Sequence, residues 1–105
     1  PASLTKMMTL YLLFEALEKG RVAMDSHFLV SAKAASQPPT NIFLSPGDKI
    51  TARLAIQALI IRSANDVAMV VAEGLGGNQE GFSRMMNQKA RELGMNSTVF
   101  YNPSG

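Results

Sequence analysis

Cysteine is absent from this 105-residue chain. Without cysteine the chain has neither disulfides nor thiolate metal sites, and redox chemistry says nothing about its compartment. Histidine is almost absent as well, and the single His27 has no carboxylates near it at ligand spacing. We therefore expect no metal site and no cofactor.

Clustered basic residues and aromatic rings are scarce too. The ten lysines and arginines are spread along the chain, the net charge is +2, and aromatic residues make up 7%. Nucleic-acid surfaces combine basic clusters with stacking rings, so we expect no nucleic-acid partner. There is no signal peptide, and no stretch approaches 18 uninterrupted apolar residues, so membrane contact is expected only through segments outside this sequence.

Hydrophobic residues, by contrast, are plentiful at 47%. This content predicts a packed core, and the length predicts one domain. The abrupt start at Pro1 and the stop after the turn-like "NPSG" indicate a piece of a longer protein.

Four segments show the apolar spacing of helices. In the last of them, residues 78–93, the residues predicted to face inward are Phe82, Met85, Met86 and Leu93. Those predicted to face outward are Arg84, Lys89 and Arg91. The predicted helices span residues 3–18, 52–61, 67–72 and 78–93, with Asn78 as an N-cap and Gly20 and Gly94 after helix ends.

The remaining segments are less regular. Residues 24–37 read as a short helix or an extended piece that begins with capping residues Asp25 and Ser26. Residues 37–50 contain Pro38, Pro39 and Pro46 and are predicted to form a surface loop with room for a short hairpin. Residues 97–103 read as a short extended segment before a turn. The chain is thus predicted to be mostly α.

Helices this apolar need a partner surface. In a 105-residue piece, that surface is expected on a missing sheet or on another chain, through dimerisation of exposed apolar helix faces.

Ser3 and Lys6 stand at the start of the first helix, in the pattern S-x-x-K. One interpretation makes Ser3 an ordinary N-cap. Two features disagree with it: a capping box would carry Glu or Gln where Lys6 stands, and a lysine in the first turn interacts unfavourably with the helix dipole. The other interpretation is chemical, since residues i and i+3 share one helix face, with Cβ atoms roughly 5–6 Å apart. An amine kept neutral by burial and a second cation can take the serine proton, and the helix N-terminus favours the forming oxyanion.

A second polar group, "RSAND" at 62–66, interrupts the apolar periodicity between two predicted helices. Ser63, Asn65 and Asp66 could cap the helix that follows the corner. Alternatively, Ser63 and Asn65 face Ser3 across a cleft. There Ser63 could relay a proton to a leaving amine, and Asn65 could hydrogen-bond the lysine or a substrate amide.

"PASLTK", "SAN" and the tail "LGMNSTVFYNPSG" occur in an order and at separations that together resemble one family. They are similar to the low-molecular-weight penicillin-binding proteins, the serine D-alanyl-D-alanine carboxypeptidases of bacterial cell-wall metabolism (peptidase family S11). The tail matches the family's F-x-N-P-x-G segment, so the resemblance spans the whole chain.

The resemblance implies an acyl-enzyme mechanism on peptidoglycan stem peptides that end in D-Ala-D-Ala. By motif position Ser3 is the nucleophile, Lys6 its general base, Ser63 the proton relay and Asn65 the residue that holds substrate and lysine. β-Lactams are expected to acylate Ser3. The implied location is the periplasm or the outer face of the cytoplasmic membrane.

The family's fold is a β-sheet flanked by helices together with an all-helical region, and the site lies between them. Residues 1–105 resemble a truncated helical part of this DD-peptidase/transpeptidase-like catalytic domain, with the β-sheet missing. The family's third motif, Lys-Thr-Gly, supplies a second cation and one oxyanion N–H, and it is absent here; "EKG" at 18–20 has no threonine. We therefore expect the 105 residues alone to be inactive.

Three alternatives remain from the sequence. A class A β-lactamase of the same fold would carry Ser-Asp-Asn and a glutamate in E-x-x-L-N, which "ELGMN" at 92–96 resembles. We interpret Glu92 instead as a solvated helix charge. A transpeptidase is the second. The third is a non-enzymatic helical interaction domain, in which Ser3 and Ser63 are caps and the seven methionines form an adaptable apolar surface.

Overall fold

Five helices and one two-stranded sheet make up the computed structural model, which describes residues 2–37 and 44–105. The predicted hairpin within 37–50 falls partly on residues 38–43, including Pro38 and Pro39, which lie outside the described residues. The mostly α prediction is confirmed, and the elements are α1 (Ala2–Glu18), β1 (His27–Leu29), α2 (Ala32–Ala35), β2 (Lys49–Thr51), α3 (Ala52–Arg62), α4 (Asn65–Gly76) and α5 (Gln79–Glu92).

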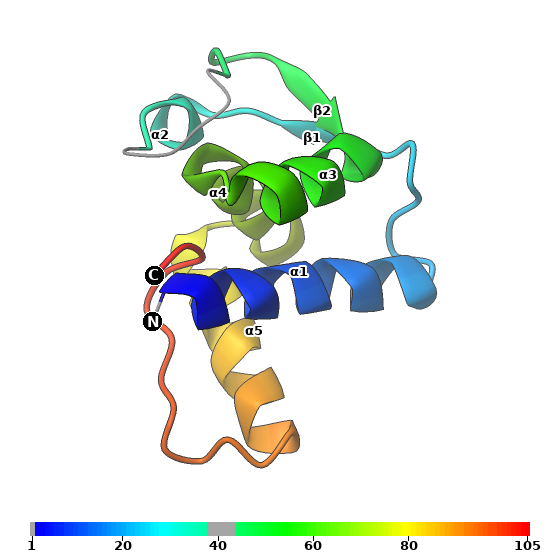
Figure 1. Cartoon of the computed structure of the whole chain (residues 1–105). Helices are drawn as coiled ribbons and strands as arrows, with labels where there is room; N and C mark the ends of the chain where they lie inside the picture. The colour runs from blue at the N-terminus through cyan, green and yellow to red at the C-terminus, as the bar shows by residue number, and fades with distance from the viewer. Residues whose placement is uncertain (1, 38–43) are drawn as a thin grey trace.

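Helix α4 is the centre of the fold. It contacts all four other helices and β1, and its residues from Asn65 to Ala72 are all buried. Figure 1 shows α3 beside it, the small sheet and α2 above, and α1 and α5 below. An apolar helix buried on every side belongs in the interior, so the other elements pack around it.

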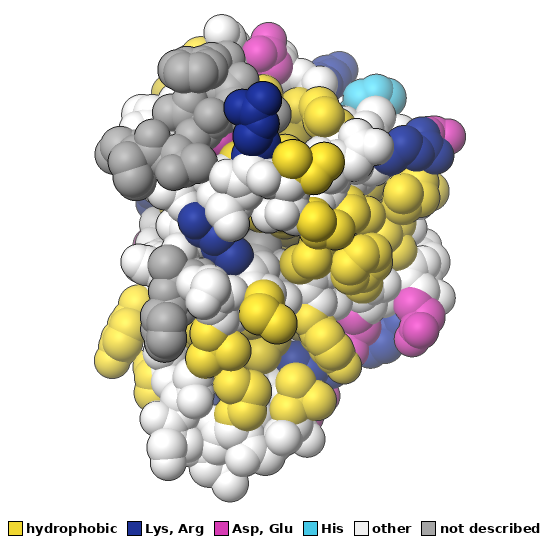
Figure 2. All heavy atoms as spheres, in the orientation of Figure 1, with side chains coloured by type: hydrophobic (Ala, Val, Ile, Leu, Met, Phe, Trp, Pro, Cys, Tyr) yellow, Lys and Arg dark blue, Asp and Glu magenta, His cyan; other side chains and the backbone are white. Residues whose placement is uncertain are grey.

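Helix α1 is apolar around its circumference but buries only one face here. Thr5, Met8, Thr9, Leu12 and Leu13 are buried at helical spacing. The opposite face leaves Met7, Tyr11 and Phe14 exposed by 44–67%. On the face of the molecule in Figure 2, apolar side chains gather over α1 and α3. None of the described helices is both long and apolar enough to cross a membrane.

The sheet joins two segments that are distant in sequence. Strands β1 and β2 are antiparallel, and Phe28 is paired with Ile50. Thr51 ends β2 and also caps α3, because its side chain accepts a hydrogen bond from the Leu54 N–H. The short helix α2 is capped by Ser31, so the prediction that Asp25 and Ser26 cap a helix is wrong. Ser26 instead accepts a hydrogen bond from the Ala23 N–H in a turn.

Helix α5 begins as predicted, since the Asn78 side chain accepts a hydrogen bond from the Gly81 N–H at 2.6 Å. The junction with α4 is tight: a Cβ on Gly76 would lie 2.5 Å from the Phe82 backbone nitrogen, so only glycine fits there. Phe82 and Met86 are buried as predicted.

Two predicted orientations on α5 are wrong. Leu93 is 50% exposed, because it lies at the end of the helix beyond the core. Lys89 is not on the outer face: its side chain is only 13% exposed and pairs with Glu15 of α1 at 2.7 Å.

Candidate active site

Ser3 lies in the first turn of α1. Helix α1 already includes Ala2, so Ser3 is a helical residue and its interpretation as the N-cap is wrong. It is exposed, and Lys6, one turn later, is half-buried. The free N–H groups of a first helical turn place positive potential around a side chain in this position.

Ser63 lies at the corner between α3 and α4. It is the residue after α3, where its N–H donates to the Leu59 carbonyl at 3.2 Å. Helix α4 has Ala64 as its N-cap, with no side-chain cap. The interpretation of Ser63 as an N-cap for α4 is therefore wrong.

The backbone of Ser63 is unusual. Its φ and ψ are 49° and 42°, the left-handed region, and it is the only non-glycine residue with positive φ among those that the structure describes. This conformation costs roughly 1–2 kcal/mol for a residue with a Cβ. Such strain tends to occur where function fixes the position of a side chain.

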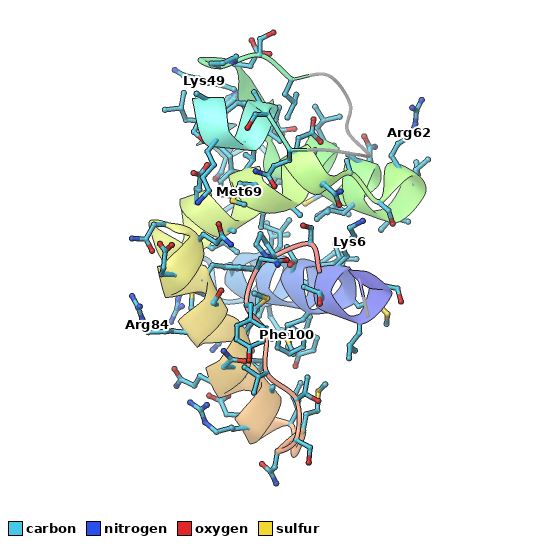
Figure 3. All side chains as sticks on the ribbon, turned by 90° about the vertical axis from the view of Figure 1, so that its left-hand side faces the viewer. Lys6, Lys49, Arg62, Met69, Arg84 and Phe100 are labelled. Atoms are coloured by element: carbon cyan, nitrogen blue, oxygen red, sulfur yellow. The ribbon has the colours of Figure 1, made fainter. Side chains whose placement is uncertain are left out.

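The first turn of α1 and the corner between α3 and α4 line the same hollow. Ser3, Lys6 and Ser63 line it together, with Met7 and Leu10 of α1 and Leu59 and Ile60 of α3, and its volume is about 260 Å³. Figure 3 shows Lys6 extending from α1 toward the helices above, whereas Arg62 projects away at the outer end of α3. The structure thus brings together three of the four predicted site residues, from opposite sides of a hollow with apolar walls.

Asn65, the fourth, does not line this hollow. It is the first residue of α4 and is only 9% exposed, so it is largely buried. The next residue, Asp66, is fully buried, and its Oδ1 accepts from the Val67 N–H at 2.8 Å. The sequence pattern alone did not separate a lining residue from a buried one.

Glu92, the candidate β-lactamase base, is far from this hollow. It accepts a hydrogen bond from Lys89, which also pairs with Glu15 of α1. Glu15 is twelve residues beyond Ser3 on the same helix, about 18 Å at 1.5 Å per residue. The Glu92 side chain is 52% exposed, as expected of a helix charge at the surface, although it is ion-paired. Among the described residues no group of three metal-ligating side chains comes together.

The chain is similar to known proteins over its whole length. The family model described as D-alanyl-D-alanine carboxypeptidase matches residues 1–105. The chain is 43% identical over 105 residues to the D-alanyl-D-alanine carboxypeptidase DacF of Bacillus subtilis, covering 100% of this chain and 27% of that one. The chain therefore spans about a quarter of the length of this curated relative.

Solved structures agree as well. The D-alanyl-D-alanine carboxypeptidase DacD from Francisella tularensis superposes with a TM-score of 0.96 at 36% identity, over 100% of this chain and 25% of that one. Penicillin-binding protein D2 from Listeria monocytogenes, in its ampicillin-bound form, superposes with a TM-score of 0.74 at 30% identity, over 100% and 42%. The chain belongs to the D-alanyl-D-alanine carboxypeptidase family, peptidase family S11, and its helices have the fold of part of those penicillin-binding proteins.

Proposed function

We propose that the protein carrying these residues is a serine D-Ala-D-Ala carboxypeptidase that acts on peptidoglycan stem peptides through an acyl-enzyme. The observation that carries the proposal is the single hollow lined by Ser3, Lys6 and Ser63. Two hydroxyls and an amine on opposite walls are the groups that acyl transfer needs. The names of the relatives support the choice of D-Ala-D-Ala as the substrate.

In the first step the Lys6 amine, acting as the general base, takes the Ser3 hydroxyl proton while Ser3 Oγ attacks the carbonyl carbon of the penultimate D-Ala. The carbonyl oxygen becomes an oxyanion near the N-terminus of α1, whose free N–H groups favour negative charge. The tetrahedral intermediate then collapses and the C–N bond breaks.

The leaving amine of the terminal D-Ala needs a proton. Ser63, which lines the same hollow, is proposed to pass on the proton that Lys6 has taken. Water then hydrolyses the ester on Ser3, with Lys6 again acting as the base. Asn65 is proposed to orient Lys6 or a substrate amide from its buried position at the start of α4.

A β-lactam presents a carbonyl to the same nucleophile. The relative from Listeria was solved with ampicillin bound, and we propose that β-lactams acylate Ser3 here. Because the substrate is part of the cell wall, we place the protein in the periplasm or on the outer face of the cytoplasmic membrane.

The test is covalent labelling of the full-length protein that carries these residues with a fluorescent penicillin, followed by trypsin digestion and mass spectrometry. Trypsin cleaves after Lys6, so the added mass is expected on the peptide that ends there and contains Ser3. Ser3→Ala should abolish labelling, and Lys6→Met should slow it by about 10²–10⁴-fold. The matched control is Ser97→Ala, which alters an exposed serine in the turn after α5.

Labelling that survives Ser3→Ala, or that Ser97→Ala reduces equally, would contradict the proposal. The rate of release separates two activities on the same site. Slow release of bound penicillin with cleavage of a D-Ala-D-Ala peptide agrees with a carboxypeptidase, whereas fast penicillin hydrolysis would identify a β-lactamase.

A further inference from the structure

Residues 100–105, called the strap below, are the one family-like motif to which the proposed chemistry gives no task. The strap contains the "FYNPSG" of the F-x-N-P-x-G pattern and is held by side chains from two helices. Figure 1 shows the C-terminal end of the chain beside the start of α1.

Helix α5 holds the start of the strap. Asn87 Nδ2 donates to the Phe100 carbonyl at 2.9 Å, and the Phe100 N–H donates back to Asn87 Oδ1 at 2.6 Å. One turn earlier, Ser83 Oγ donates to the Tyr101 carbonyl at 2.8 Å. Residues 83 and 87 share one helix face, so α5 binds two successive strap residues through their backbone. Phe100 itself is buried in a cluster with Met8 and Leu12 of α1.

The strap then turns back on itself. Asn102 Oδ1 accepts hydrogen bonds from the N–H groups of Ser104 and Gly105 at 3.1 and 2.5 Å. This local turn is typical of asparagine. It surrounds Pro103, whose side chain is fully buried.

Helix α1 binds the end of the strap through Thr9. Thr9 is fully buried, and its Oγ1 lies 2.7 Å from the Pro103 carbonyl oxygen and 3.2 Å from the Thr5 carbonyl oxygen. A hydroxyl has one proton to donate, so the shorter distance favours Pro103 as its acceptor. This bond joins residues 94 positions apart.

Thr9 lies one helical turn beyond Lys6. A helix transmits a constraint along its axis, so a fixed Thr9 fixes the axial position and rotation of the preceding turn. Lys6 and Ser3 occupy that turn and the one before it. Figure 3 shows Phe100 of the strap close to α1, on which Lys6 also lies.

We propose that Thr9 and the strap position Ser3 and Lys6 against Ser63, with Thr9 as a positioning residue for acyl transfer. The inference rests on the function proposed above. None of the strap residues lines the hollow, although the strap packs against α1, which forms one of its walls. Its effect is therefore on where the nucleophile and the base lie, and a misplacement of about 1 Å can cost about 10²-fold in rate.

The test compares Thr9→Val, which replaces the hydroxyl by a methyl group, with Thr9→Ser, which keeps the hydroxyl, in the full-length protein that carries these residues. The control is Ser31→Ala, at a residue that does not line the hollow; it removes the Ser31 Oγ bond to Glu73 at 2.7 Å and the bond that Ser31 Oγ accepts from the Ala34 N–H as the cap of α2. For each variant we measure the rate of acylation by a fluorescent penicillin and the hydrogen–deuterium exchange of the amides of residues 6–10.

We expect Thr9→Val to slow acylation by roughly tenfold or more and to speed exchange of these amides. For Thr9→Ser, the acylation rate and the exchange rate should stay close to those of the unsubstituted protein, called the parent below. Ser31→Ala should leave both within about twofold of the parent. Should Thr9→Val fail to fold, Asn87→Ala releases the strap from α5 without altering α1, and it should change both readouts in the same direction.

Equal acylation by Thr9→Val and Ser31→Ala, with Ser3→Ala unlabelled, would overturn the positioning role and leave the proposed function standing. Acylation that persists in Ser3→Ala would overturn the proposed function, and this inference with it.

Discussion

At the scale of single residues, Ser63 is the most constrained position in the candidate site. Its left-handed backbone is compatible with glycine at no steric cost, yet the chain has a serine there. The hydroxyl is therefore present at the expense of backbone strain, as expected where a side chain has a chemical role.

Replacement of Ser63 by glycine and by alanine should separate the effect of backbone strain on stability from the effect of the lost hydroxyl on activity. Both variants lose the proposed relay, so both should slow release of D-Ala from a D-Ala-D-Ala peptide. Alanine keeps the Cβ and its strain, whereas glycine removes it. We expect the free energy of unfolding of Ser63→Gly to exceed that of Ser63→Ala by up to about 1 kcal/mol. Urea denaturation measures the difference, and an alanine variant that is equally stable or more stable would refute the strain.

The sequence predicted these site residues because S-x-x-K and S-x-N have fixed local spacing. The shared hollow was predictable for Ser3, Lys6 and Ser63, which lie at helix ends. The position of Asn65 was not predictable, because whether a residue in the first turn of α4 faces a cleft or the core depends on how that helix packs. The positive φ of Ser63 gave no signal either, since the usual sign of that conformation is a glycine.

At the scale of elements, α1 and α5 are joined by a charge cluster around Lys89. The amine hydrogen-bonds Glu15 and Glu92 at 2.7 and 2.9 Å and lies 6.0 Å from the centre of the Tyr11 ring. Hydrogen bonds from Lys89 lower the pKa values of both Glu15 and Glu92 below 4.5. The bonds to Glu15 and then Glu92 raise the pKa of Lys89 above 10.5.

These directions predict two pH limits for the stability that the cluster provides. The carboxylates contribute fully above an unfolded pKa of about 4.5, and this contribution is lost as pH falls through their lowered folded values. The lysine contributes fully below about 10.5, and its part is lost as pH rises through its raised folded value.

Lys89→Met should therefore lower the melting temperature most between about pH 5 and pH 10 and progressively less outside that range. Thermal denaturation at pH 3, 7 and 11 tests this expectation. Arg91→Met, on the exposed side of α5, is the control and should show a small, nearly pH-independent effect. A Lys89→Met deficit that stays constant from pH 3 to pH 7 would contradict it.

The elements themselves were partly predictable. The helices follow from apolar periodicity, and the caps at Asn78 and Gly94 follow from local chemistry. The three-residue strands are too short for an alternating pattern, and their pairing joins His27 to Thr51. Lys89 was assigned outward because its partner Glu15 lies 74 residues away, beyond the reach of any local pattern.

At the scale of the whole molecule, apolar surface remains uncovered. Met7 and Phe14 of α1, and Ile60 and Ile61 of α3, are exposed by 46–76%. The chain spans about a quarter of its relative DacF, and its 105 residues contain no Lys-Thr-Gly. Apolar patches of this kind are typical of surfaces that pack against something else.

We predict that the 105-residue chain by itself is not acylated at a normal rate. The resemblance implies that one oxyanion donor and a second cation come from the Lys-Thr-Gly motif, which these residues lack, and loss of one oxyanion donor alone costs about 10²–10³ in rate. Incubation with a fluorescent penicillin, beside penicillin-binding protein D2 from Listeria monocytogenes, which was solved with ampicillin bound, as a positive control, measures the rate. Circular dichroism of the same sample checks that the helices are formed. Labelling at the rate of the control would show that these residues suffice.

The double use of Thr51 has a mechanical consequence. Because Thr51 both ends β2 and caps α3, no linker separates the strand from the helix, and the two are expected to move together. Ser63 follows the far end of α3, twelve residues beyond Thr51 and about 18 Å from it along the helix axis. A tilt of about 10° at the sheet would therefore swing its hydroxyl by about 3 Å, the length of a hydrogen bond.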